Sequence, residues 1–83
     1  MKPRDRFATN LRKARQKKQI SQEELGFRCD LHRTEISLLE RGGREPRLAT
    51  IMKLCAALDT TPNELSSGIR WIPAQSRFQI KGS

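Results

Sequence analysis

The chain has 83 residues, enough for one small domain and too few for a second core. Its 17 Lys and Arg residues against 9 Asp and Glu give a formal net charge of +8, which favours a polyanionic partner, above all nucleic acid. No apolar run approaches the ~18 residues of a membrane span, and no signal-peptide core follows the basic start, so we expect a soluble cytoplasmic protein without a membrane partner.

The two cysteines and the single histidine limit the chemistry that the chain can carry. Cys29 and Cys55 have no partners at metal-ligand spacing, so no zinc site is expected. Both fall on apolar helix faces, which predicts small buried side chains with free thiols, as suits a reducing compartment. There is no carboxylate pair and no nucleophile beside a base. We therefore expect neither an enzyme nor a cofactor.

The first predicted helix covers residues 5 to 18. Phe7, Leu11 and Ala14 recur at helical spacing, which indicates one buried face. Charged residues occupy the other faces, and residues 1 to 18 carry eight Lys or Arg side chains against one acidic residue. The side chains expected to add long-range attraction to a polyanion are Arg12, Lys13 and Lys17.

The second predicted helix begins after Ser21 and ends near Cys29. Ser21 followed by Glu24 predicts a capping box, in which the hydroxyl accepts from a backbone N–H and the carboxylate reaches back to the cap. Gly26 would let another helix approach closely. Asp30 is expected in the left-handed conformation at the turn that follows.

The third predicted helix begins at Arg33, with His32 at its N-cap, and has two different sides. At 100° per residue, Ile36 and Leu39 lie together on an inner side, flanked by Glu40. A glycine at 42 or 43 ends the helix. The outer side is expected to carry Thr34, Ser37, Leu38 and Arg41, with Arg33 at its border.

The remaining segments change in character along the chain. Residues 48 to 58 are nearly apolar on all sides, which predicts a central buried helix. Thr61, Pro62 and Glu64 suit the N-cap, the first and the third position of a helix, which predicts the start of a short fifth helix. From residue 69 on, apolar and polar residues alternate on both sides of a turn at residues 73 to 76, which predicts two short strands.

The order of these elements, together with the stretches SQEEL, HRTEIS, LLERG, REP and TPNEL, resembles the phage-repressor-like helix-turn-helix family (lambda-repressor fold, Xre-type). The resemblance covers residues 21 to 65, although the family commonly has glycine where this chain has Asp30. It implies an all-α, five-helix DNA-binding domain at residues 1 to 67. Residues 68 to 83 would then be a short C-terminal extension, possibly β, that can serve in dimerisation.

Site residues follow from the helix-turn-helix layout, in which the second of the two helices enters the major groove. Bases would be contacted by Arg33, Thr34, Ser37, Leu38 and His32, with arginine suited to guanine O6 and N7. Phosphates would be contacted by Gln22, Arg41, Arg44 and Arg47. The resemblance also implies an ion pair between Arg15 and Glu40 that fixes the third helix. A dimer interface is expected from Leu65, Ile69, Trp71, Phe78 and Ile80.

The predicted function is a sequence-specific, double-stranded DNA-binding transcriptional regulator that acts as a homodimer on a near-palindromic operator. The resemblance includes phage repressors and the controllers of restriction–modification operons, and the sign of regulation stays open. An alternative is an antitoxin-type module that binds a second small protein through its tail and regulates its own gene. RNA binding is compatible with the charge, but stacking aromatics are few.

Overall fold

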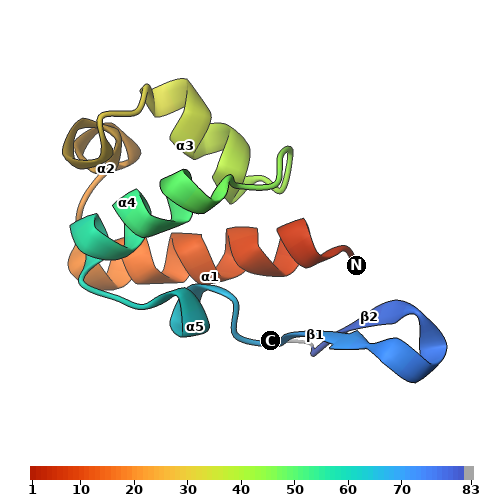
Figure 1. The fold of residues 1–83 in the computed structure, drawn as a ribbon. Coiled ribbons are helices and arrows are strands. Elements are labelled where there is room, and N and C mark those ends of the chain that lie inside the picture. The colour runs from red at the N-terminus through yellow and green to blue at the C-terminus, as the bar shows by residue number, and fades with distance from the viewer. Residues whose placement is uncertain (82–83) are drawn as a thin grey trace.

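Five helices precede a β-hairpin in the computed structural model, which describes residues 1–81 (Figure 1). The fold class is thus confirmed: a five-helix body with a small β extension. The helices and strands are α1 (Pro3–Lys18), α2 (Gln22–Cys29), α3 (Arg33–Glu40), α4 (Leu48–Leu58), α5 (Pro62–Leu65), β1 (Ile69–Ile72) and β2 (Arg77–Ile80).

Helix α1 begins earlier than the predicted residue 5 because its first turn is well capped. Pro3 occupies the first turn, where the N–H that proline lacks would have no partner within the helix. The Asp5 carboxylate accepts a hydrogen bond from the Lys2 N–H at 2.7 Å. The helix ends at Lys18, and Gln19 at its C-cap adopts the left-handed conformation with φ 60°.

Helix α2 forms one of the two hydrogen bonds of its predicted capping box. The Ser21 hydroxyl accepts from the Glu24 N–H at 3.0 Å. The reciprocal half of the predicted capping box is wrong, because the Glu24 carboxylate instead pairs with Arg28 at 3.0 Å, one turn further on. Asp30 has φ 56°, so the predicted left-handed turn residue is confirmed.

Gly26 permits a close approach of the turn and of Arg33, the first residue of α3, so the predicted approach of another helix is confirmed at its N-terminal end. A Cβ at this position would lie 2.6 Å from the carbonyl oxygen of Leu31, which is backbone and cannot easily move away. The absence of a side chain therefore allows the tight connection between α2 and α3, which sets the angle at which α3 leaves the turn.

We predict that Gly26→Ala lowers the free energy of unfolding by about 1–3 kcal/mol, the usual cost of overpacking, despite alanine's higher helix propensity. Urea denaturation followed by circular dichroism measures this. Gly43→Ala is a matched control, since its Cβ would meet the mobile end of the Leu38 side chain. Equal stability of the two variants would contradict the role given to Gly26.

The core lies between α1 and the other helices, and six of its side chains are fully buried: Leu11, Leu25, Ile36, Leu39, Leu54 and Leu65. The prediction of a central buried helix at residues 48 to 58 is confirmed for only one side of α4. Leu54, Cys55 and Leu58 are buried, but Leu48 is 75% exposed and Met52 is 51% exposed. Helix α4 has no described neighbour on that side, so its apolar residues there face solvent.

The two predicted strands are confirmed as an antiparallel hairpin. Trp71 pairs with Phe78 and Ile69 with Ile80 across it. The Trp71 and Phe78 rings pack edge to face, with centroids 5.0 Å apart and planes at 67°. The hairpin leaves α5 and extends outward from the helical body, past the N-terminal end of α1 (Figure 1).

Candidate nucleic-acid interface

Helix α3 has one buried side and one side open to solvent. Ile36 and Leu39 are fully buried in the core, and the Glu40 side chain is 3% exposed. Arg33 and Thr34 are exposed at the start of the helix. The predicted division into inner and outer sides therefore holds, with every fully buried apolar side chain of α3 turned toward α1 and α2.

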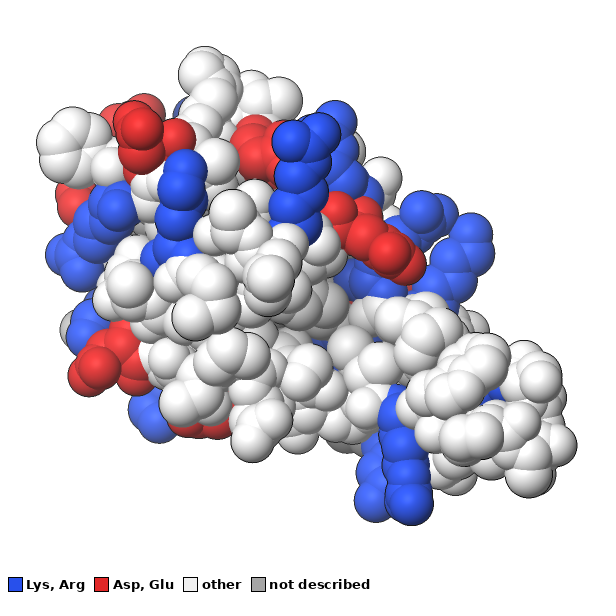
Figure 2. Space-filling model, viewed as in Figure 1, with Lys and Arg blue, Asp and Glu red and all other residues white. Residues whose placement is uncertain are grey.

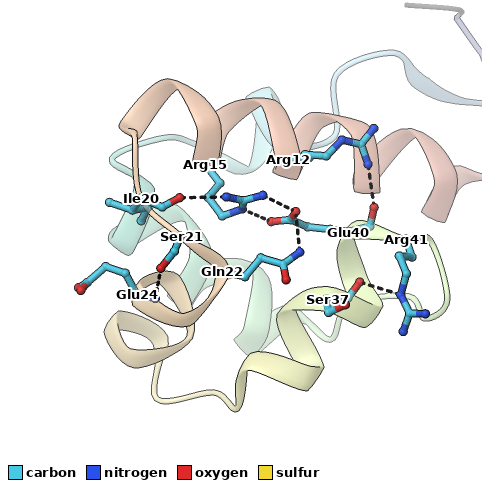
Figure 3. A network of polar contacts seen from close by, with 9 residues as sticks. All are labelled: Arg12, Arg15, Ile20, Ser21, Gln22, Glu24, Ser37, Glu40 and Arg41. Atoms are coloured by element: carbon cyan, nitrogen blue, oxygen red, sulfur yellow. Dashed lines mark hydrogen bonds and ion pairs between the residues drawn. The ribbon is translucent and has the colours of Figure 1, made fainter.

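Glu40 is held by side chains from two other helices (Figure 3). Arg15 of α1 donates from Nε to Glu40 Oε2 at 2.5 Å and from Nη2 to Oε1 at 2.9 Å, a two-point contact. Gln22 of α2 donates from Nε2 to Oε1 at 3.2 Å. A single buried carboxylate thus connects α1, α2 and the end of α3.

Two backbone contacts complete this network. Arg15 Nη1 donates to the Ile20 carbonyl at 2.9 Å, and Arg12 Nη1 donates to the Glu40 carbonyl at 3.0 Å (Figure 3). The hydrogen bond to Glu40 raises the pKa of Arg15 above its ordinary value, against an opposing effect of burial. The contacts of Arg15 and Arg12 with Glu40 fix the position of α3 on α1 at the C-terminal end of α3.

The predicted base-contacting residues all lie on or beside the first turns of α3. His32 caps the helix, because its Nδ1 accepts from the Thr34 N–H at 3.0 Å. A neutral ring with an accepting Nδ1 carries its proton on Nε2, which can donate outward. Ser37 and Leu38 are half-buried, and the Leu38 side chain lies against Gly43 in the following loop.

The predicted phosphate-contacting residues are in different situations. Gln22 is engaged with Glu40, whereas Arg41 and Arg47 are exposed at the two ends of the α3–α4 loop, and Arg41 Nε donates to the Ser37 carbonyl at 3.3 Å. Arg44 Nη1 lies 2.6 Å from Glu35 Oε1. This pair was not predicted, since no spacing rule connects a loop residue to a helix residue nine positions earlier.

A shallow hollow of about 400 Å³ lies where α2 and α3 begin. Arg33, one of the predicted base-contacting residues, borders this hollow together with the first residues of α2. Backbone N–H groups at the start of a helix and a nearby guanidinium suit an anion. The residues that line the hollow are Arg15, Ser21, Gln22, Glu23 and Arg33.

Two of the three α1 residues predicted to attract a polyanion, Lys13 and Lys17, lie on a different face from α3. Arg12 bonds to the end of α3, whereas Lys13 and Lys17 line a groove of about 620 Å³ between α1 and the α4–α5 region. Helices α3 and α5 pack against opposite sides of α1 (Figure 1). Lys13 and Lys17 therefore do not share the surface of α3, and any attraction they exert on DNA acts at a distance.

Other kinds of site find no support within residues 1–81. No group of three or more His, Cys, Asp or Glu side chains comes together there, and none of the helices described is long and apolar enough to cross a membrane. Cys29 and Cys55 are buried free thiols, and burial raises the pKa of each above its ordinary value. Both are thus poor nucleophiles.

The fold and this interface define a helix-turn-helix DNA-binding regulator. A helix-turn-helix family model matches residues 11–65, and the chain belongs to that family. It is 47% identical over 60 residues to the control protein C.BamHI of Bacillus amyloliquefaciens, covering 71% of this chain and 74% of that protein. It is 40% identical over 65 residues to the control protein C.MunI of a Mycoplasma species, covering 77% and 88% of the two chains.

A solved structure is similar over the same extent. The restriction-modification controller protein C.AhdI from Aeromonas hydrophila superposes with a TM-score of 0.72 at 42% identity, covering 75% of this chain and 94% of that one. The hairpin lies beyond the residues that the family model matches, which end at 65. The recognised part of the chain is therefore the helical body.

Proposed function

We propose that this chain is the controller of a restriction–modification operon, binding a near-palindromic operator as a homodimer. Its similarity to C.BamHI, C.MunI and C.AhdI supports this role. Residues 1 to 67 form the DNA-binding domain, and residues 68 to 83 are an extension used in dimerisation. The protein acts by occupying DNA in the cytoplasm, without catalysis, and either blocks or assists transcription.

The observation that supports base reading most directly is the fixed, exposed start of α3. Arg33 and Thr34 project into solvent from a helix whose other side is fully buried and ion-paired. In a major groove, Arg33 donates to guanine O6 and N7, and the Thr34 methyl contacts a thymine methyl. Ser37, Leu38 and the outward nitrogen of His32 lie beside them and complete the contact surface.

Phosphate contacts come from the rim of this surface. Arg41, Arg44 and Arg47 follow α3 in the loop, and Gln22 lies at the start of α2 beside the hollow that Arg33 also borders. The Glu35–Arg44 pair has a role here, because a free carboxylate in the first turn of α3 would repel DNA. Arg44 cancels that charge while remaining 56% exposed.

We expect Arg44→Ala to weaken binding to all duplex sequences alike and to lower the slope of log K against log salt by about one unit. Fluorescence anisotropy across a salt series measures the slope. Arg28→Ala is a matched control, because it also removes one partner of an exposed ion pair. An unchanged slope for Arg44→Ala, or an equal change for both variants, would remove Arg44 from the phosphate contacts.

A homodimer follows from the size of the reading surface. One α3 helix contacts only a few base pairs, and two copies can place their helices in successive major grooves about 34 Å apart. Of the residues proposed for the interface, Trp71 and Phe78 are 49% and 46% exposed, whereas Leu65 is 1% exposed within its own core. The hairpin side chains, not Leu65, are therefore available to a partner.

Selection of bound duplexes from a random pool tests the proposed function. We expect one enriched sequence with two related half-sites separated by about one helical turn. Retention of random and enriched duplexes with equal affinity would overturn sequence-specific binding. A single enriched half-site without symmetry would overturn the homodimer and leave base reading intact.

A further inference from the structure

Helix α4 carries an apolar stripe that faces solvent. Leu48 and Met52, the two most prominent side chains, are 75% and 51% exposed, and Ala56 continues the stripe one turn further on. Figure 2 shows a broad uncharged area across the middle of the face on which α4 lies. We name Leu48, Ala49, Met52 and Ala56 the α4 stripe. Soluble monomers seldom leave such contiguous apolar side chains uncovered without a use for them.

The hairpin has a second exposed apolar surface. Directly paired residues of antiparallel strands lie on one face, as do residues two apart, so Trp71 and Phe78 share a face with Ile69 and Ile80. Ile69 packs against the core of its own chain, but the two rings lie further out and are about half exposed. We name Ile69, Trp71, Phe78 and Ile80 the hairpin face.

The uncharged character of both surfaces makes them the part of the chain where a second copy can bind against the general repulsion. Two molecules of net charge +8 repel each other over most of their surfaces. The α4 stripe and the hairpin face contain no charged side chain, and Arg70 and Arg77 lie on the opposite face of the hairpin. Lys53 borders the α4 stripe beside Ala49, but it would meet no basic side chain of a hairpin face packed there, because Arg70 and Arg77 point the other way.

The arrangement of the two surfaces favours a reciprocal contact. In a two-fold symmetric dimer, a contact between one surface and a different surface is made twice. If each hairpin lies on the partner's α4, all four apolar surfaces become covered. A contact between the two hairpins would leave both α4 helices exposed to water, and a contact between the two α4 helices would leave both hairpins exposed. The hairpin also extends away from its own body and would be marginal alone (Figure 1).

We infer that the dimer forms by exchange of arms, in which the hairpin face of each subunit packs on the α4 stripe of the other. This inference rests on the proposed homodimer and specifies its contacts. Trp71 and Phe78 of one copy then bury Leu48 and Met52 of its partner. The basic face of each hairpin stays in solvent, and α3 of each subunit remains free for DNA.

A charge-swap experiment tests this exchange. Analytical ultracentrifugation without DNA compares Met52→Glu, Trp71→Lys and their equimolar mixture. Each variant alone should be a monomer, because a charge would be buried against an apolar surface. The mixture should regain the dimer, since one contact is unaltered and the other pairs glutamate with lysine. Leu48→Glu and Phe78→Lys form a second pair with the same expectation, and Arg70→Gln is the control that stays dimeric.

The other outcomes each overturn the exchange and identify what replaces it. If Trp71→Lys is monomeric but Met52→Glu stays dimeric, the two hairpins pair with each other. If Met52→Glu is monomeric but Trp71→Lys stays dimeric, the two α4 helices pair with each other. If both variants stay dimeric, or the wild-type chain is a monomer, neither surface is an interface. Failure of base reading is detected separately, because monomeric variants should still prefer an enriched half-site over random DNA.

Discussion

Glu40→Ala should lower the free energy of unfolding by about 3–5 kcal/mol, the range seen when one partner of a buried ion pair is removed. Glu40 is 3% exposed and Arg15 is 15% exposed, so the substitution would leave a guanidinium largely shielded from water and without its carboxylate. Gln22 would lose its hydrogen bond to the same oxygen. Urea denaturation measures the loss.

Two controls separate the burial of this pair from ordinary surface charge. Glu24→Ala removes the exposed pair with Arg28 and should cost less than about 1 kcal/mol. The double variant Arg15→Ala, Glu40→Ala should lose less free energy of unfolding than the two single variants lose together. Removing both side chains leaves no buried charge without a partner. Additive losses in this cycle would show that the pair does not hold α3 on α1.

Arg33→Ala should abolish the preference for one base pair in each half-site, a loss of roughly 1–3 kcal/mol of discrimination. Arg33 is the exposed guanidinium at the start of α3, where it can approach guanine O6 and N7 together. Competition binding with duplexes changed at one position at a time measures the preference. Affinity for random DNA should fall much less than affinity for the operator.

Arg41→Ala is the matched comparison, since Arg41 is exposed at the other end of the same helix. It should weaken binding to every duplex by a similar factor, as expected of a phosphate contact. If the two variants lose affinity uniformly, Arg33 is a phosphate contact as well. If Arg41→Ala also relaxes the preference at one position, the division between the two arginines is wrong.

The sequence predicted most of what local rules control. The buried side of α3 was predicted correctly, because Ile36 and Leu39 are three residues apart and so lie on one face of a helix. Ser21 and Thr61 marked helix starts, since each accepts from a backbone N–H three residues on. The hairpin was predicted from a weak alternation alone, and the tertiary packing of Ile69 supports it.

The errors arose where local patterns depend on neighbours in space. Residues 48 to 58 were expected to form a central buried helix, but an apolar pattern does not say which sides have a neighbour, and Met52 is 51% exposed. Glu24 was expected to bond back to the N-cap at Ser21, but its carboxylate contacts Arg28, one turn further along the helix. The Glu35–Arg44 pair depends on how the loop folds back, which no short spacing indicates.

Methylation interference at guanine N7 tests the central claim most directly, because N7 lies in the major groove where the outer side of α3 is proposed to bind. With the enriched operator, methylation of one guanine in each half-site should block binding of the wild-type chain. The same methylation should have little effect on Arg33→Ala. Interference that is absent for the wild-type chain, or that is equally strong for Arg33→Ala, would contradict base reading by this helix.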